Sequence, residues 1–152
     1  MKIFFKAAWA KGNVMRKNFK SDATFALAEE YVGRICHFAP CKLLALEPKL
    51  KKSDNSVLWF CDTAKNAQAL STGDLALRLR QLETSGVREW SVVIGGADGF
   101  DEESKRRLKP DFLWSFGPMT LPHELALVVA VEQVYRAYTV LRNLPYHTRH
   151  AS

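Results

Sequence analysis

Residues 90–96 read WSVVIGG and residues 112–118 read FLWSFGP, and in both stretches an apolar run ends at a glycine. A third run, VLWFC at 57–61, ends at Asp62. Apolar runs without polar alternation are typical of parallel strands that are covered on both faces. Helical patterns alternate with these strands along the chain. The sequence therefore predicts an α/β fold with a mostly parallel sheet of five to six strands, flanked by helices.

The other elements follow from periodicity and from helix-capping residues. Polar or charged loops are expected at 12–22 and 47–56, and Ser21 or Asp22 is expected to cap the first helix. Further strands are predicted at 2–9 and 43–46, and helices at 23–35, 73–86, 101–108 and 122–141.

The last predicted helix is apolar on nearly every side, whereas a helix on the surface of a monomer usually shows one apolar stripe. Such a helix is either central in the fold or part of a subunit interface. We favour the interface, because a terminal helix rarely lies inside a small sheet protein.

Bulk properties predict one domain, spanning residues 1–152, with a formal net charge of +6 and a pI of about 9.3. This excess of positive charge points to an anionic partner, and RNA is favoured over a membrane. The three cysteines, Cys36, Cys41 and Cys61, are an odd number, which does not suit a set of disulfides, and their spacings match no zinc-binding pattern. We therefore expect free thiols and no metal. We identify no signal peptide and no membrane span, and we expect a cytoplasmic protein.

The ends of three predicted strands form the candidate ligand site: Cys61-Asp62, Gly95-Gly96 and Gly117-Pro118. Ligands of open parallel sheets bind beyond the carboxyl ends of the strands, and glycine lets the main chain approach them closely. Three such ends suit a flat adenosyl group. Taken singly, each is equally consistent with an ordinary turn, and neither the dinucleotide fingerprint nor a P-loop is present.

Charged and aromatic residues near the C-terminus leave two interpretations each. His123 at the helix start is either a capping or interface residue or an acid–base group. Arg136 either pairs with Glu132 four residues earlier or contacts an RNA phosphate. The tail at 143–150 is either a frayed terminus or a segment that stacks on bases.

Three motifs resemble the RlmH family of SPOUT-class methyltransferases: VVIGGADGF at 92–100, WSFGPMTLPHELALVVAVEQVYRAY at 114–138, and NLPYH at 143–147. The opening MKIFFKAAWAKG resembles the family more loosely. The resemblance implies a C-terminal trefoil knot, S-adenosyl-L-methionine as cofactor, a homodimer built through the last helix, and methylation of a pseudouridine in large-subunit (23S) ribosomal RNA, free or in the assembled ribosome.

The resemblance also implies roles for individual residues. His123, Arg136, Tyr146 and His147 match positions near the methyl-acceptor pocket, with the tail closing the partner's site, and His123 and His147 are candidate proton acceptors. The implied cofactor contacts are Cys61, Asp62, Gly95, Gly96, Gly117, Pro118, Met119, Thr120, Leu121 and Pro122.

The chain departs from the family pattern at three places. Leu127 stands where the family has an arginine, which predicts weaker binding of RNA or of the cofactor carboxylate. Ala97-Asp98 replaces Pro-Glu in the glycine loop. Only residues 47–56 join the second and third strands, where the family has a helix, so we expect apolar surface near Trp59. These departures leave two alternatives: a dimeric RNA- or ribosome-binding SPOUT protein with impaired catalysis, or a SPOUT methyltransferase with another RNA substrate.

Overall fold

A six-stranded sheet, in which every pair of neighbouring strands is parallel, forms the centre of the computed structural model. The structure describes residues 1–146. The strand order is β2-β1-β5-β3-β6-β4. The strands are β1 (Lys2–Ala7), β2 (Cys41–Ala45), β3 (Ser56–Cys61), β4 (Gln68–Ala69), β5 (Glu89–Ile94) and β6 (Phe112–Ser115).

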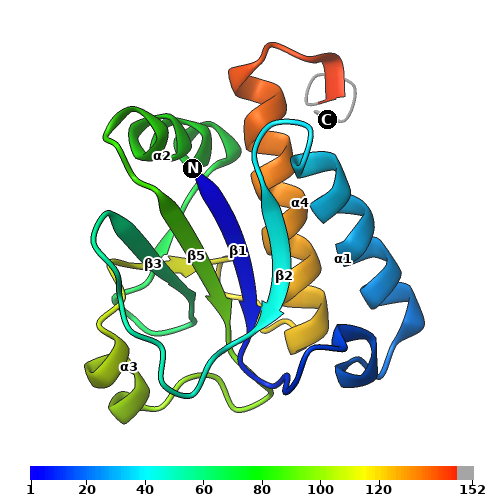
Figure 1. Cartoon of the computed structure of the whole chain (residues 1–152), viewed down its shortest axis with the longest axis vertical. Coiled ribbons are helices and arrows are strands. Elements are labelled where there is room, and N and C mark those ends of the chain that lie inside the picture. Colours follow the sequence, from blue (N-terminus) through cyan, green and yellow to red (C-terminus); the bar gives the residue numbers. More distant parts are fainter. Residues whose placement is uncertain (147–152) are drawn as a thin grey trace.

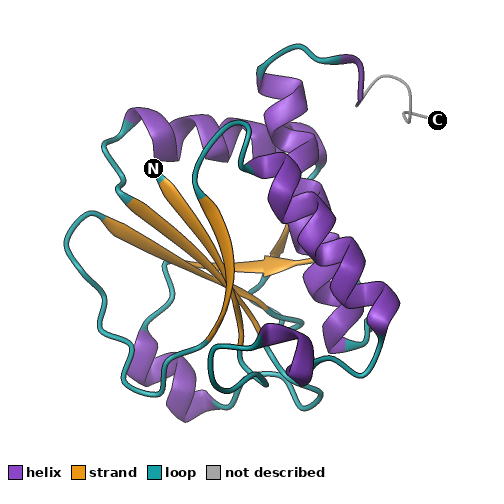
Figure 2. Cartoon of the chain, turned by 45° about the vertical axis from the view of Figure 1, so that its right-hand side comes forward, coloured by secondary structure: helices purple, strands orange, loops and turns teal. Residues whose placement is uncertain are grey.

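Within residues 1–146, four α-helices and one short 3-10 helix accompany the sheet: α1 (Asp22–Ile35), α2 (Thr72–Thr84), α3 (Glu102–Leu108), α4 (His123–Leu141) and the 3-10 helix η1 (Met15–Asn18). Helices α1, α2 and α4 gather on one face of the sheet, which we call the front face (Figures 1 and 2). Helix α3 lies at the opposite side, which we call the back face. The predicted α/β fold with a mostly parallel sheet is confirmed, and the knot stays a prediction.

The alternation of side chains along the inner strands separates two cores. Ile3 and Phe5 of β1 point to the front face and join the main apolar cluster with the helices. On β3, Trp59 also belongs to this front cluster, whereas Leu58 and Phe60 point to the back face, where they pack with Leu108 of α3. Two apolar faces explain why these strands read as continuous apolar runs.

Helix α4 is central in the fold, because it packs against α1 on one side, α2 on the other, and the strands β1 and β5 beneath. Its fully buried side chains include Leu127, Val131, Val134 and Tyr138. The apolar cover on nearly every side therefore has an explanation within one chain. Our choice of a subunit interface over a central position was wrong as an explanation of this pattern.

The link between β2 and β3 crosses the sheet without a helix. It starts from the carboxyl end of β2 and reaches the start of β3, and β1 and β5 lie between these two strands. The expectation of apolar surface near Trp59 is wrong: this side chain is only 3% exposed, because it faces the helices of the front face and packs on Trp90. The face of the sheet that is less covered by helices is the back face instead.

Local elements differ from the sequence prediction in two places. The loop predicted at 12–22 contains η1, and a loop after Asp62 contains β4, a two-residue strand paired with β6. Ser21 caps α1 as predicted, since its hydroxyl accepts a hydrogen bond of 3.2 Å from the backbone N–H of Thr24.

Candidate functional site

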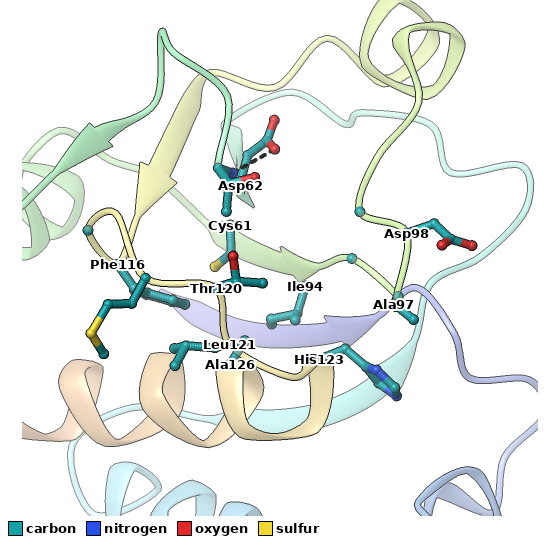
Figure 3. Close-up of a pocket in the computed structure, with 16 residues that line it drawn as sticks. Cys61, Asp62, Ile94, Ala97, Asp98, Phe116, Thr120, Leu121, His123 and Ala126 are labelled. Carbon is teal, nitrogen blue, oxygen red and sulfur yellow. Dashed lines mark hydrogen bonds between the residues drawn. The ribbon is translucent and has the colours of Figure 1, made fainter.

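A cavity of about 250 Å³ opens beyond the carboxyl ends of β3 and β5 (Figure 3). The loop after β6 and the first turn of α4 form its other wall. We call it the strand-end pocket. Its lining residues are Cys61, Asp62, Thr63, Ile94, Gly95, Gly96, Ala97, Asp98, Gly99, Phe116, Gly117, Met119, Thr120, Leu121, His123 and Ala126.

Most of the predicted cofactor contacts therefore lie around one cavity. Of these positions only Pro118 and Pro122 fall outside the lining. His123, proposed from the resemblance as a proton acceptor, also lines it. The sequence did not predict Ile94, Phe116 or Ala126 as cofactor contacts, although Ile94 and Phe116 end the apolar runs that located the strand ends.

The glycine loop after β5 turns sharply beside the pocket. The backbone N–H of Gly99 donates a hydrogen bond of 2.9 Å to the carbonyl of Gly96, and Gly99 has a φ of +71°. A Cβ on Gly95 would lie 3.1 Å from backbone atoms of Gly99. A side chain at Gly95 would therefore push the loop apart by a few tenths of an ångström, and the loop leaves main-chain groups beside the cavity.

The segment after β6 forms the wall between the strands and α4. Gly117 turns the chain with a φ of +97°, a conformation that L side chains rarely adopt. The Ser115 hydroxyl accepts a hydrogen bond of 3.1 Å from the backbone N–H of Gly117. The sequence Gly117-Pro118 is thus a strand stop followed by a fixed turn, which places Met119, Thr120 and Leu121 along the cavity.

Asp62 is the acidic residue at the end of β3. Its Oδ2 lies 2.6 Å from Nζ of Lys105 on α3, and its Oδ1 accepts a 2.8 Å hydrogen bond from the backbone N–H of Thr63. Only 9% of the Asp62 side chain is exposed. The neighbouring Cys61 is a buried thiol whose pKa is raised, first by desolvation and then by the Asp62 charge. Cys61 is therefore protonated and suited to packing rather than nucleophilic attack.

His123 stands at the start of α4, against the indole of Trp9. The two ring centroids are 4.6 Å apart and the planes meet at 65°. The Trp9 Nε1 donates a hydrogen bond of 3.0 Å to the carbonyl of Asn18, so the indole is fixed by η1. His123 thus has one side on a fixed aromatic wall and lines the strand-end pocket with another.

Glu124, next to His123, joins α4 to α1. Its carboxylate accepts hydrogen bonds from the backbone N–H groups of Lys20 (3.0 Å) and Ser21 (3.1 Å) and from the Thr24 hydroxyl (2.8 Å). Burial by itself would raise the pKa of Glu124, but these hydrogen bonds and the adjacent His123 hold it below the ordinary value. No sequence pattern indicated this role, because the hydrogen-bond partners lie about a hundred residues away along the chain.

Arg136 and Tyr146 lie away from this cavity within one chain. Thirteen residues of helix separate His123 from Arg136, which is about 20 Å at 1.5 Å per residue. Arg136 forms hydrogen bonds of 2.9 and 2.6 Å with Oε1 of Glu132, the pairing that four-residue spacing suggested. The Tyr146 hydroxyl donates to the same oxygen at 3.0 Å and lies 3.3 Å from the hydroxyl of Tyr31.

These four side chains form what we call the tyrosine–arginine cluster: Tyr31, Glu132, Arg136 and Tyr146. Desolvation and then Glu132 and Tyr31 keep the pKa of Tyr146 well above its ordinary value, so its hydroxyl stays protonated. The fourth residue assigned to the methyl-acceptor pocket, His147, lies outside the described residues.

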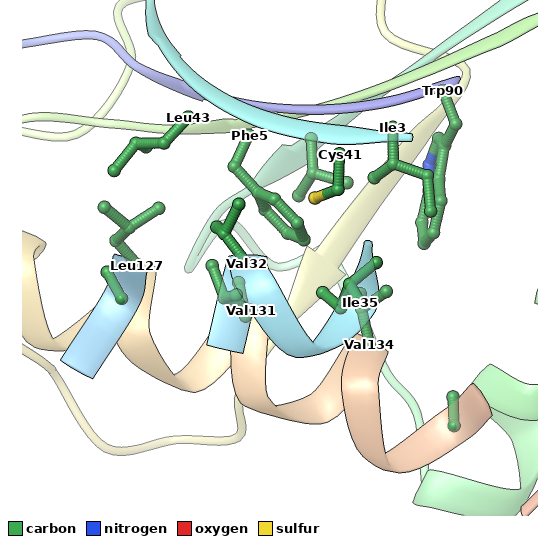
Figure 4. Close-up of a cluster of buried hydrophobic side chains, with 14 of the residues drawn as sticks. Ile3, Phe5, Val32, Ile35, Cys41, Leu43, Trp90, Leu127, Val131 and Val134 are labelled. Carbon is green, nitrogen blue, oxygen red and sulfur yellow. The ribbon is translucent and has the colours of Figure 1, made fainter. Parts of the chain in front are cut away.

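Leu127, where the family has an arginine, belongs to the core (Figure 4). Its side chain is 0% exposed and lies among the front-face cluster with residues such as Phe5 and Val131. It is not part of the strand-end pocket lining. In this chain the position therefore contributes apolar packing, and an arginine with the same backbone would place its stem in that core.

Within residues 1–146, no group of three or more His, Cys, Asp or Glu side chains is arranged to hold a metal ion. In the same part of the chain, no helix combines the length and the apolar character that a membrane crossing requires.

Comparison with known proteins gives a family. The family described as "Predicted SPOUT methyltransferase" matches residues 14–147. Ribosomal RNA large subunit methyltransferase H of Ruegeria pomeroyi is 34% identical over 126 residues, covering 76% of this chain and 80% of that protein. The enzyme of the same name from Stenotrophomonas maltophilia is 35% identical over 136 residues, covering 78% and 85%.

One solved structure, a SAM complex of the methyltransferase Lpg2936 from Legionella pneumophila, is 16% identical with a TM-score of 0.45, covering 91% of this chain and 66% of that one. That likeness is too distant to bear on function. The family match and the two relatives cover most of the sequence, and we conclude that the chain belongs to the SPOUT methyltransferase family.

Proposed function

We propose that this protein transfers a methyl group from S-adenosyl-L-methionine to large-subunit ribosomal RNA, with a pseudouridine as the acceptor. The observation that carries the proposal is the strand-end pocket, because two of the three stretches that resemble the family's motifs, 92–100 and 114–138, supply most of its lining. Relatives named ribosomal RNA large subunit methyltransferase H supply the substrate class. A ribosomal substrate would place the enzyme in the cytoplasm.

The chemistry of the strand-end pocket fits an adenosyl cofactor. Ile94, Leu121 and Ala126 offer apolar surface for a planar base, and the glycine loop offers main-chain donors and acceptors. The cavity of about 250 Å³ lies just under the roughly 300 Å³ typical of ligand sites, and it is open, so a bound cofactor would extend beyond it. We propose that Cys61, Asp62, Gly95, Gly96 and Gly117 to Pro122 hold it.

When bound, the cofactor supplies a methyl carbon that is already electrophilic, so the chain's task is mainly to position the acceptor. The acceptor base must lose the proton of its ring nitrogen. The imidazole of His123 lines the pocket and packs against Trp9, with its Nε2 3.8 Å from a carboxylate oxygen of Glu124, which suits it to receive that proton directly or through water. His147 remains the second candidate.

A second copy of the chain would supply the residues that one chain keeps apart. The tyrosine–arginine cluster lies about 20 Å along α4 from His123, so both can act on one nucleotide only if the cluster comes from the partner. Leu125 on α4 is 40% exposed, and Met119 in the segment before α4 is 70% exposed. These side chains are suitable for the symmetric interface through α4 that the family resemblance implies.

Two measurements test the proposal. Calorimetric titration with S-adenosyl-L-methionine should show saturable binding to the folded protein. Transfer of labelled methyl groups should then be measured with intact ribosomes and with isolated ribosomal RNA. Absence of cofactor binding would favour an RNA-binding protein without catalysis. Cofactor binding without transfer to any ribosomal substrate would favour a different RNA acceptor.

A further inference from the structure

A second cavity, of about 340 Å³, lies on the back face of the sheet and is separate from the strand-end pocket. It lies between β1, β5 and β3 below, the link from β2 to β3 at one side, and the end of α3 at the other. We call it the back-face pocket. The family has a helix between its second and third strands, and here residues 46–55 contain none. The pocket opens over strands that this loop crosses.

Lys6 forms part of the floor of this pocket. It sits on β1, where its Cα is paired with Leu44 of β2 and Val93 of β5, and its side chain points to the back face. The residue is only 7% exposed. Among residues 1–146 its ammonium group has neither a hydrogen-bond acceptor nor an ion-pair partner, and the ring of Phe4 lies 5.7 Å from it.

The Lys6 side chain is mostly buried, but its ammonium group borders the cavity and is accessible there. Desolvation lowers the pKa of Lys6, and the more distant carboxylates of Glu47 and Glu89 offset this only in part. Partial desolvation makes this positive charge near the end of β1 costly, and an anion bound in the pocket would offset that cost. Its position gives a reason to look for a ligand rather than for a structural role.

The rim of the pocket is strongly basic. Its charged lining residues are Lys6, Lys51, Lys52, Arg107, Lys109 and a single acid, Glu89. Lys52 is paired with Asp111 at 2.5 Å, and Arg107 donates a hydrogen bond of 2.8 Å to the carbonyl of Pro48. Lys51 and Lys109 are exposed and have no ion-pair partner within residues 1–146. The rim therefore keeps cations available for an anionic ligand.

We propose that the back-face pocket binds a phosphodiester of the RNA substrate, with Lys6 at its floor and Lys51 and Lys109 at its rim. The assignment rests on the proposed function for the choice of RNA as the polyanion. Cations that contact phosphates position a nucleic acid without reading its sequence. The pocket thus adds affinity and orientation, while the strand-end pocket holds the nucleotide that is methylated.

The location of the pocket fixes which part of the RNA it contacts. It opens near the first residues of β3 and β5, Ser56 and Glu89, whereas the strand-end pocket lies past their last residues. The floor residue Lys6 is in register with Val93, one residue before Ile94 of the strand-end pocket, so the pockets are separated by the sheet rather than by a full strand length. The phosphodiester therefore belongs to a segment of the RNA other than the target nucleotide.

RNA affinity of the full-length protein, measured without cofactor, tests this site. The probe is a fluorescein-labelled single-stranded RNA of mixed sequence, and anisotropy is recorded over a range of salt concentrations. The variant is Lys51→Gln with Lys109→Gln. Its control, Lys17→Gln with Arg80→Gln, removes the same charge from exposed positions outside both pockets.

Each phosphate contact contributes about 0.7 to the slope of log binding constant against log salt for a single strand, so the rim variant should lower the slope by about 1.4. The control should keep the slope of the unaltered protein. A slope unchanged in the rim variant, or lowered equally in the control, overturns the site, as does an unaltered protein that binds no RNA. Normal RNA affinity with weaker binding to whole ribosomes would assign the pocket to a ribosomal protein and equally overturn it.

Lys6 is tested by chemical labelling of the unaltered protein, because a substitution at this position could cause a folding defect. Acylation of lysines by an amine-reactive reagent is mapped with and without the RNA probe. RNA should protect Lys6, Lys51 and Lys109 and leave Lys17 unchanged, and equal labelling of Lys6 in both samples counts against the site. Methyl transfer to ribosomes, measured in parallel, tests the proposed function independently.

Discussion

Lys105 Nζ lies 2.6 Å from Asp62 Oδ2, which ties helix α3 to the carboxyl end of β3 beside the strand-end pocket. Only 18% of the Lys105 side chain and 9% of the Asp62 side chain are exposed. The pair therefore fixes an acidic group at the strand-end pocket, and it connects this pocket to the helix that also forms the edge of the back-face pocket.

Loss of Lys105 should destabilise the fold and disturb the strand-end pocket. Lys105→Met leaves the Asp62 carboxylate buried without its cation, and such a loss costs about 3 kcal/mol in buried pairs. Urea denaturation should show this decrease in the free energy of unfolding, and calorimetry should show weaker cofactor binding. Lys52→Met breaks an ion pair whose side chains are 37% and 39% exposed, and it should cost less than about 1 kcal/mol. Equal costs would contradict the prediction.

Glu124→Gln should remove much of the link between α4 and α1. The carboxylate accepts three hydrogen bonds, and hydrogen bonds to a charged group are worth about 2 kcal/mol. Urea denaturation at neutral pH should show a loss of at least that size. Glu30→Gln is the matched control, since Glu30 makes only an exposed pair with Arg34 on one helix and should cost about 0.5 kcal/mol or less.

Glu124 should also make stability fall at acid pH. Its pKa in the folded protein lies below the ordinary value of 4.5, so the folded state holds this proton less tightly than the unfolded state. The contribution is complete above pH 4.5 and is lost as the pH falls through the lower, folded pKa. The free energy of unfolding, measured by urea denaturation and plotted against pH from neutral to acid, should therefore change less for Glu124→Gln than for the unaltered protein. Parallel curves would show that Glu124 does not titrate differently in the two states.

The sequence predicted the inner strands well because covered parallel strands have an unmistakable apolar pattern. Residues 57–61 and 90–94 fall within one residue of β3 and β5. It predicted the strand-end pocket for a related reason, since parallel strands bring their carboxyl ends to one edge. β4 was missed because its two residues are exposed and form a strand only through their pairing with β6.

Contacts between segments that lie far apart in the chain could not be predicted from the sequence. The apolar cover of α4 did not tell a central helix from an interface helix, because both bury every side. Trp59 was expected near the surface, since nothing in the sequence says on which face the missing helix of the β2–β3 link would lie. The separation of Arg136 from His123 follows from the length of α4. Comparing single positions with the family's motif does not take this distance into account.

Gly96→Trp should abolish cofactor binding while the protein stays folded. A Cβ at Gly96 would meet only Trp9 Cβ at 3.7 Å, an ordinary contact, so the backbone accepts a side chain and the indole fills the cavity. Calorimetry with S-adenosyl-L-methionine should give no heat, with circular dichroism unchanged. Gly33→Ala on α1, where a Cβ meets nothing within 4 Å, should keep cofactor binding and raise helix stability by up to about 1 kcal/mol. Cofactor binding by Gly96→Trp would remove this loop from the site.

Tyr146→Phe should reduce methyl transfer and leave cofactor binding intact. The hydroxyl belongs to the tyrosine–arginine cluster, where it donates to Glu132 at 3.0 Å, and this cluster lies far along α4 from the strand-end pocket. Methyl transfer to ribosomes should fall, with the calorimetric titration unchanged. The control is Tyr138→Phe: its hydroxyl also donates to a glutamate, Glu83 at 3.4 Å, but on the α2 side of the helix. An equal loss in both variants would point to stability rather than to the acceptor site.

Mixing two impaired variants tests whether each active site is shared between copies of the chain. Gly96→Trp disables the strand-end pocket and Tyr146→Phe weakens the cluster. If a site combines the pocket of one copy with the cluster of the other, a mixed dimer has one site with both changes and one with neither. Random exchange in equal amounts then restores about a quarter of the sites of the unaltered protein, as two-fold symmetry requires. If both parts act within one chain, every site in the mixture keeps one defect, and activity stays at the average of the two variants.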